Sequence, residues 1–180
     1  MQTISSSRLM TMRFQISRRV FTLLLSCGLP AGSLWALDPP QANPVLTVTC
    51  KLGVTNQGAS ARWDMAMLEA LPQTSFRTST PWYNEPVTFS GPLLRDVLTA
   101  LKANGTEIRA TALNDYRITI PFSDTQRFDM IVATRMNGQH MPVRNKGPLF
   151  IVYPFDSQPE LRRATYYERS IWQLKALTIE

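Results

Sequence analysis

The 180-residue sequence predicts a single α+β domain. A chain of this length, with 44% hydrophobic residues, can bury about two thirds of the surface that its unfolded state exposes. One long segment has apolar residues at helical spacing. Several shorter segments alternate apolar and polar residues or are continuously apolar, which is typical of strands. This composition excludes a disordered or collagen-like chain.

The first elements follow a Pro-rich lead-in over residues 37–45, where each proline favours extended backbone. Residues 45–52 then alternate as a strand does. On this strand we expect Cys50 to be a small, buried core residue. Asp64 is expected to cap a short helix that Pro72 ends.

A second helix is predicted by one apolar face. Ser90 is expected to cap it, Pro92 to lie in its first turn, and Gly105 to end it. The apolar residues that share this face are Leu93, Leu94, Val97, Leu98 and Leu101.

The pattern then changes to period two. Residues 108–112 and 117–120 alternate on either side of Asn114 and Asp115, which predicts a hairpin that Pro121 closes.

Two continuous apolar runs follow this hairpin, at residues 130–133 and 149–152. They predict central strands that are buried on both faces. Between them, Asn137 and Gly138 form a strong signal for a tight turn. A last strand is predicted over residues 174–179.

The charge is unevenly distributed along the chain. Four of the 19 basic residues lie in residues 1–36, where there is no acidic residue, which leaves 15 bases against 13 acids in the rest. A nucleic-acid-binding protein concentrates basic charge on its folded domain. The near balance of charge in the body therefore argues against nucleic acid as a partner.

Residues 1–36 have the pattern of a bacterial export signal peptide, a basic stretch followed by an apolar run. Residues 17–23, with Arg18 and Arg19, resemble the twin-arginine consensus, and an ordinary Sec leader is the alternative. Cleavage is expected after Ala36 or near residues 31–33 and would give a periplasmic protein. An uncleaved anchor and a lipid anchor at Cys27 are the other interpretations.

Common catalytic constellations receive no support from the sequence. His140 is the only histidine, and Cys50 is the only cysteine after the leader, whereas a zinc site needs three or four ligands. No G-x-S-x-G elbow presents a serine, and no Gly-rich phosphate-binding loop is present. Standard hydrolases and nucleotide enzymes are therefore not expected, and we predict no catalytic residue and no metal ligand.

Four motifs, taken in order, carry a resemblance. They are residues 91–98 (GPLLRDVL), residues 112–116 (ALNDY) with Ile120 and Pro121, residues 133–138 (ATRMNG), and residues 146–149 (KGPL) with Tyr153 and Pro154. Their order and spacing resemble the molybdopterin-binding domain of the sulfite oxidase family. The resemblance implies the sulfite-oxidase-type molybdopterin-binding fold over residues 46–180, a mixed β-sheet with short flanking helices. It also suggests molybdopterin as a cofactor.

The sequence departs from this family at the expected metal ligand. The family places a cysteine thiolate, which binds molybdenum, upstream of residues 91–98. This chain has Thr78, Ser79 and Thr80 there, followed by Pro81 and Trp82. A threonine hydroxyl does not replace a soft, charged thiolate. Family-type molybdenum redox chemistry is therefore not expected.

We accordingly predict an exported ligand-binding or partner-binding protein on this scaffold. The alternative is a molybdopterin-dependent oxidoreductase of the sulfite oxidase family with an unusual ligand set. The expected partner is a small anionic ligand or a periplasmic or membrane protein, with membrane attachment only if the leader is uncleaved or lipidated.

Basic residues around the predicted turn, together with Trp82, are expected to hold a planar, anionic ligand by charge-assisted hydrogen bonds and stacking. A solvated basic hairpin beside core aromatic residues is the alternative. The candidate binding residues are Thr78, Thr80, Trp82, Asn114, Asp115, Tyr116, Arg135, Arg144 and Lys146.

Overall fold

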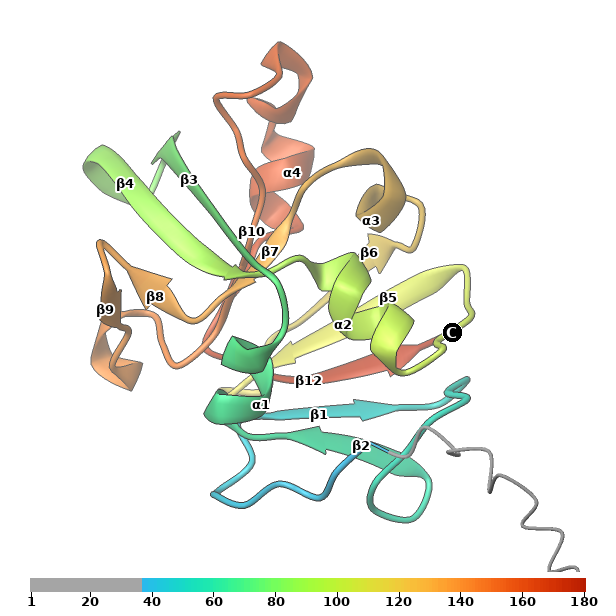
Figure 1. Ribbon diagram of the computed structural model, residues 1–180. Helices are drawn as coiled ribbons and strands as arrows, with labels where there is room; N and C mark the ends of the chain where they lie inside the picture. The colour runs from blue at the N-terminus through green and yellow to red at the C-terminus, as the bar shows by residue number, and fades with distance from the viewer. Residues whose placement is uncertain (1–36) are drawn as a thin grey trace, which may run out of the picture. The chain divides into compact units, whose positions relative to one another are not determined.

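The computed structural model describes residues 37–180 (Figure 1). The predictions on the leader, which concern Arg18, Arg19, Cys27 and Ala36, fall outside the described residues. Residues 37–45 contain no helix or strand, and the backbone amides of Gln41 and Ala42 in this lead-in donate to the Asp64 carboxylate. Over the described range, no helix is long and apolar enough to span a membrane.

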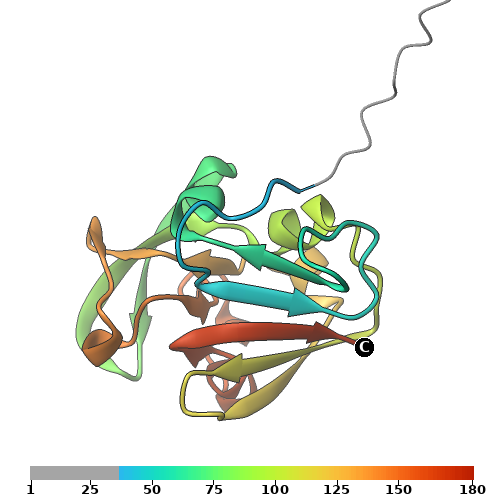
Figure 2. The same cartoon turned by 90° about the horizontal axis from the view of Figure 1, so that it is seen from below.

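A five-stranded sheet contains the first and the last strand of the described residues, β1 and β12, side by side. Its order is β2-β1-β12-β5-β6, with β1 and β12 parallel and the other neighbours antiparallel, so the predicted mixed sheet is confirmed. Figure 2 shows β1 beside the C-terminal strand β12. The strands are β1 (Leu46–Thr49), β2 (Ser60–Trp63), β5 (Glu107–Ala112), β6 (Arg117–Pro121) and β12 (Leu174–Ile179).

The prediction for Cys50 is wrong. Strand β1 ends at Thr49, and Cys50 and Lys51 both have positive φ angles, of 61° and 33°. This turn takes the chain out of the pleat, so the alternation of buried and outward-facing residues stops before Cys50. Its side chain is consequently exposed.

The predicted start and end of the second helix are also wrong, although its apolar face is confirmed. Helix α2 covers Leu94–Ala100, and Leu94, Val97 and Leu98 are buried. Ser90 is a residue of strand β4 (Tyr83–Pro92), where it pairs with Ser75 of β3 (Gln73–Thr80), so it does not cap a helix. The helix ends at Ala100 rather than at Gly105, because Lys102 has a positive φ of 48°, which interrupts the helical backbone. Gly105 instead packs closely against the C-terminal residue Glu180.

A long hairpin forms the second sheet. Strands β3 (Gln73–Thr80) and β4 pair antiparallel, and β4 then pairs with the short strand β8 (Arg135–Met136), which pairs with β9 (Gln139–His140). The two residues between β8 and β9, Asn137 and Gly138, both have positive φ, of 50° and 80°. This is the backbone of a two-residue hairpin turn, so the predicted tight turn is confirmed.

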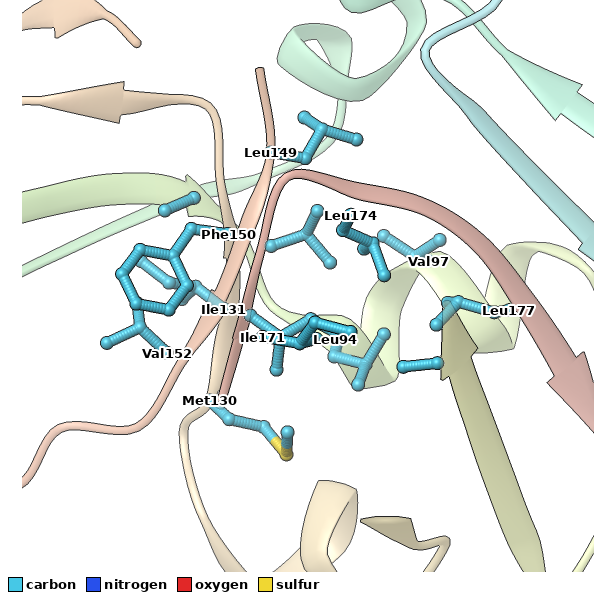
Figure 3. Close-up of a cluster of buried hydrophobic side chains, with 14 of the residues drawn as sticks. Leu94, Val97, Met130, Ile131, Leu149, Phe150, Val152, Ile171, Leu174 and Leu177 are labelled. Atoms are coloured by element: carbon cyan, nitrogen blue, oxygen red, sulfur yellow. The ribbon is translucent and has the colours of Figure 1, made fainter. Parts of the chain in front are cut away.

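Both continuous apolar runs are buried strands, as predicted. They form β7 (Ile131–Ala133) and β10 (Phe150–Val152), which pair antiparallel, and every residue in them is buried. The sheet order is β11-β10-β7, so β10 is central as predicted but β7 lies at the edge of this sheet. Strand β11 covers Ile171–Trp172. Figure 3 shows side chains of these strands meeting Leu94 of α2 in the core.

The predicted hairpin of β5 and β6 is confirmed, with Ala110 opposite Ile118. Asp64 caps the first helix as predicted, because its carboxylate accepts the amide of Met67 at 2.9 Å. The remaining elements are short: α1 (Met65–Ala70), α3 (Asp124–Arg127), α4 (Ala164–Glu168), and the 3-10 turns η1 (Val143–Asn145) and η2 (Pro159–Leu161).

Candidate functional site

A cavity of about 430 Å³ lies where three separate parts of the chain meet. Trp82 comes from the turn between β3 and β4. Ala112, Asn114 and Tyr116 come from the end of β5 and the turn that follows it, and the remaining residues come from the end of α4 through β11. The residues that line it are Trp82, Ala112, Asn114, Tyr116, Tyr167, Glu168, Ser170, Ile171 and Trp172.

Trp82 is fixed by aromatic contacts with the core. Its ring centroid lies 5.4 Å from that of Phe150, 6.1 Å from Phe155, 5.6 Å from Trp172 and 6.2 Å from Tyr167. Tilted and edge-to-face pairs at these separations are the favourable geometries of aromatic rings. One wall of the cavity is therefore a side chain anchored by buried neighbours.

The two threonines at the expected ligand position differ in their surroundings. Thr78 is 1% exposed, and its Oγ1 accepts the backbone amide of Asp156 at 3.1 Å. In return, the backbone amide of Ser79 donates to the Asp156 carboxylate at 2.6 Å, and this hydrogen bond lowers the pKa of Asp156. Thr80 lines a second cavity of about 370 Å³, next to the cavity at Trp82. Tyr167 lines both cavities and so separates them.

The turn between β5 and β6 divides its predicted site residues. The Asn114 side-chain oxygen accepts the amide of Tyr116 at 3.2 Å, and both residues line the larger cavity. Asp115 does not line it. Its carboxylate binds the Lys175 ammonium at 2.6 Å, and this hydrogen bond lowers the pKa of Asp115.

Arg135 is held by a carboxylate on the first helix. Its Nε lies 2.9 Å from Glu69 Oε1, and the same oxygen lies 2.7 Å from His140 Nε2. The hydrogen bond with His140, followed by that from Arg135, lowers the pKa of Glu69. The Arg135 charge is therefore already paired within the protein.

The other two predicted basic residues lie near η1. The Lys146 ammonium is 4.7 Å from the centroid of Trp172 and 5.6 Å from that of Tyr83. Arg144 is exposed and forms no ion pair with any residue in the range 37–180. Neither of them, nor Arg135, lines the cavity at Trp82.

The structure thus brings Trp82, Asn114 and Tyr116 together, but not with the three basic residues. Sequence reasoning did not find Tyr167, Glu168 and Trp172. Their signal was a concentration of aromatic residues over 166–172, next to a carboxylate. That signal was weak, because aromatic residues in a short segment are more often part of the core.

The comparison with protein families explains the scaffold. The model of the oxidoreductase molybdopterin binding domain matches residues 51–156. This chain belongs to that family. The comparison with curated proteins found no match. The resemblance inferred from the sequence and the expected fold, mixed β-sheets with short helices, are both confirmed.

The matched range of the oxidoreductase molybdopterin binding domain ends before part of the cavity. Tyr167, Glu168 and Trp172 lie beyond residue 156, whereas Trp82, Asn114 and Tyr116 lie inside the matched range. Five of the nine lining residues therefore belong to a segment outside the range of the family match.

The donor set does not fit a thiolate-bound molybdenum. The only thiol among residues 37–180 belongs to Cys50, which is exposed at the end of β1 and does not line the cavity. The same residues contain no group of three or more His, Cys, Asp or Glu side chains that is arranged to hold a metal. The cavity lining contains one carboxylate, Glu168, and no lysine or arginine to bind an anionic pterin.

Proposed function

We propose that this member of the molybdopterin-binding family is an exported binding module that does not carry out molybdenum redox chemistry. The observation that carries this proposal is the state of Thr78, which belongs to the Thr78–Thr80 segment where the family resemblance places the thiolate. Its hydroxyl is buried and accepts a backbone amide from Asp156. A neutral, hydrogen-bonded hydroxyl is a poor ligand for a metal that prefers thiolate.

Binding is supported by the cavity that remains beside this segment. Its volume of about 430 Å³ lies within the range of small-molecule sites, about 300 to 1,000 Å³. Six of its nine lining residues are aromatic or aliphatic and three are polar, which is the usual composition of a ligand site. The scaffold therefore retains a place for a ligand after the metal-binding thiolate is lost.

A second candidate function is molybdopterin-dependent oxidation or reduction with an unusual ligand set. The twin-arginine-like residues 17–23 favour it, because that export route carries folded proteins that often already contain their cofactor. The missing thiolate opposes it.

For the partner, the proposal includes a small anionic ligand or a periplasmic or membrane protein that contacts the exposed Arg144. No nucleic acid is expected as a partner. Because an exposed charge pair contributes little, Arg144→Ala is expected to weaken such binding about two- to fivefold.

Metal analysis and an absorption spectrum of protein purified from the exported compartment test the main proposal. We expect far less than one molybdenum per chain and no turnover of sulfite or sulfoxide. Stoichiometric molybdenum with turnover would establish the oxidoreductase instead. Cys50→Ser is the matched control, since loss of bound molybdenum in this variant would show that the exposed thiol is a ligand.

Export is tested separately by sequencing the N-terminus of the mature protein. The proposal expects a mature start between about residue 33 and residue 39. A mature product that retains the whole leader would contradict the cleaved form.

A further inference from the structure

The cavity at Trp82 has an unusual lining for a protein of this net charge. Four aromatic side chains contribute to it, from Trp82, Tyr116, Tyr167 and Trp172. Its one carboxylate belongs to Glu168, and the lining contains neither lysine nor arginine, although residues 37–180 hold 15 basic side chains against 13 acidic ones.

The aromatic rings form walls at steep angles rather than a stack. The Trp82 ring makes interplanar angles of 70° with Trp172 and 84° with Tyr167. At these angles the edge of one ring packs against the face of another, so the wall of the cavity combines ring edges and ring faces. Each face carries the negative part of the ring quadrupole, so several faces together attract a cation, as in the aromatic cages that bind quaternary ammonium groups.

Two polar side chains of the lining bond to the backbone. The Asn114 side-chain oxygen accepts the amide of Tyr116, and the Ser170 hydroxyl donates to the carbonyl of Tyr166 at 3.0 Å. Glu168 differs, because its carboxylate makes no ion pair and no side-chain hydrogen bond with any of residues 37–180. It is therefore available to a positively charged ligand at the exposed edge of the cavity.

We infer that this cavity binds a small organic cation of the quaternary ammonium class, held by the four aromatic rings and by Glu168. The inference rests on the proposed binding function and adds the chemical class of the ligand. This cationic ligand differs from the anionic ligand proposed for the basic residues, because those residues lie outside this cavity.

Lys146 gives a test of the sign of the ligand charge. Its ammonium lies 4.7 Å from the Trp172 centroid without lining the cavity, so it repels a second cation near that ring. Lys146→Met is therefore expected to strengthen binding of a cation about twofold, and it would weaken binding of an anion.

The direct experiment is calorimetric titration of the purified protein, with tryptophan fluorescence as a second readout. Three probes are used. Choline is the cation, 3,3-dimethylbutan-1-ol is a neutral molecule of nearly the same shape, and benzoate is a planar anion. Because cation–π contacts contribute about 0.5 to 2 kcal/mol, we expect choline to bind about tenfold more tightly than its neutral analogue.

Variants connect this binding to the cavity. Glu168→Gln is expected to weaken choline binding about three- to fivefold without changing the binding of the neutral analogue. Glu85→Gln is the matched control, because Glu85 is an exposed carboxylate of β4 that does not line the cavity. Tyr116→Leu is expected to weaken choline binding, and Tyr116→Phe, which keeps the ring, to retain it. Circular dichroism checks that each variant is folded.

A trimethylammonium group can come from a free metabolite or from a lipid headgroup. Cosedimentation with phosphatidylcholine vesicles, compared with phosphatidylglycerol vesicles, distinguishes these two sources. Selective binding of free choline, or of phosphatidylcholine vesicles over phosphatidylglycerol vesicles, supports the inference.

Three results would overturn it: no choline binding, equal binding of choline and the neutral analogue, or tighter binding of benzoate than of choline. Molybdenum analysis of the same preparation separates this failure from failure of the proposed function. A metal-free protein that binds benzoate would retain the binding role with a different ligand, whereas stoichiometric molybdenum with turnover would remove that role.

Discussion

Replacing Arg169 by Met is expected to destabilise the protein by about 3 kcal/mol. Arg169 follows α4, and its guanidinium lies 2.8 Å from Asp124 Oδ2 at the start of α3. The Tyr153 hydroxyl donates to the same oxygen at 2.9 Å. The Asp124 side chain is 9% exposed, so without Arg169 a buried carboxylate keeps only one neutral donor.

The magnitude follows from this burial. Removing one partner of a buried ion pair costs about 3 to 5 kcal/mol, because the remaining charge stays desolvated. The Arg169 side chain is 26% exposed, and water screens part of the pair, so the lower end of the range applies. Methionine retains much of the apolar stem, which limits the loss of packing.

Urea denaturation followed by circular dichroism measures this loss as a lower midpoint with an unchanged slope. Arg109→Met is the matched control, because Arg109 pairs with Glu180 at 2.8 Å but its side chain is 49% exposed. The control is expected to lose less than about 1 kcal/mol. If Arg169→Met lost no more than the control, the Asp124 carboxylate would not be a desolvated charge and the argument would be refuted.

Four further results are expected. Cys50 should react with a thiol reagent in the native protein nearly as fast as after unfolding, because its side chain is exposed; slow native labelling would show protection. The stability should fall as the pH rises above about 10, since burial and then the nearby carboxylate raise the pKa of Tyr153, so the unfolded state loses this proton first; a flat alkaline urea profile would contradict this. Gly91→Ala should cost about 1 to 3 kcal/mol in a urea titration, because a Cβ there would lie 2.1 Å from a carbonyl oxygen of β7, and an unchanged midpoint would show that the backbone can move apart. Changing Arg18 and Arg19 to Lys should block export, as cell fractionation would show, only if the twin-arginine route is used, and unchanged export would assign the leader to the Sec class.

Elements that depend on local pattern were accessible from the sequence. The apolar face of α2, the buried runs of β7 and β10, and the turn at Asn137 and Gly138 are each encoded by neighbouring residues. Side-chain periodicity and turn chemistry act over a few residues, so they can be read without knowing what those residues contact.

The sequence failed where a local signal competed with pairing across the fold. Ser90 and Pro92 have the chemistry of a helix start, yet β4 continues through both because its backbone pairs with β3. Cys50 lies within an alternating stretch, but the chain turns immediately after Thr49. In both cases long-range pairing or a backbone turn decided the element boundary, and a short window of sequence does not contain that information.

The sequence by itself determined the family, the absence of a cysteine near Trp82, and the aromatic residues available to a binding site. Only the tertiary structure decided which of them meet. It placed Trp82 beside Tyr167, Glu168 and Trp172 and paired Arg135 with Glu69, because these contacts join segments that are far apart along the chain. The charge of the cavity is therefore a property of the folded chain, since it depends on which charged side chains are excluded from its wall.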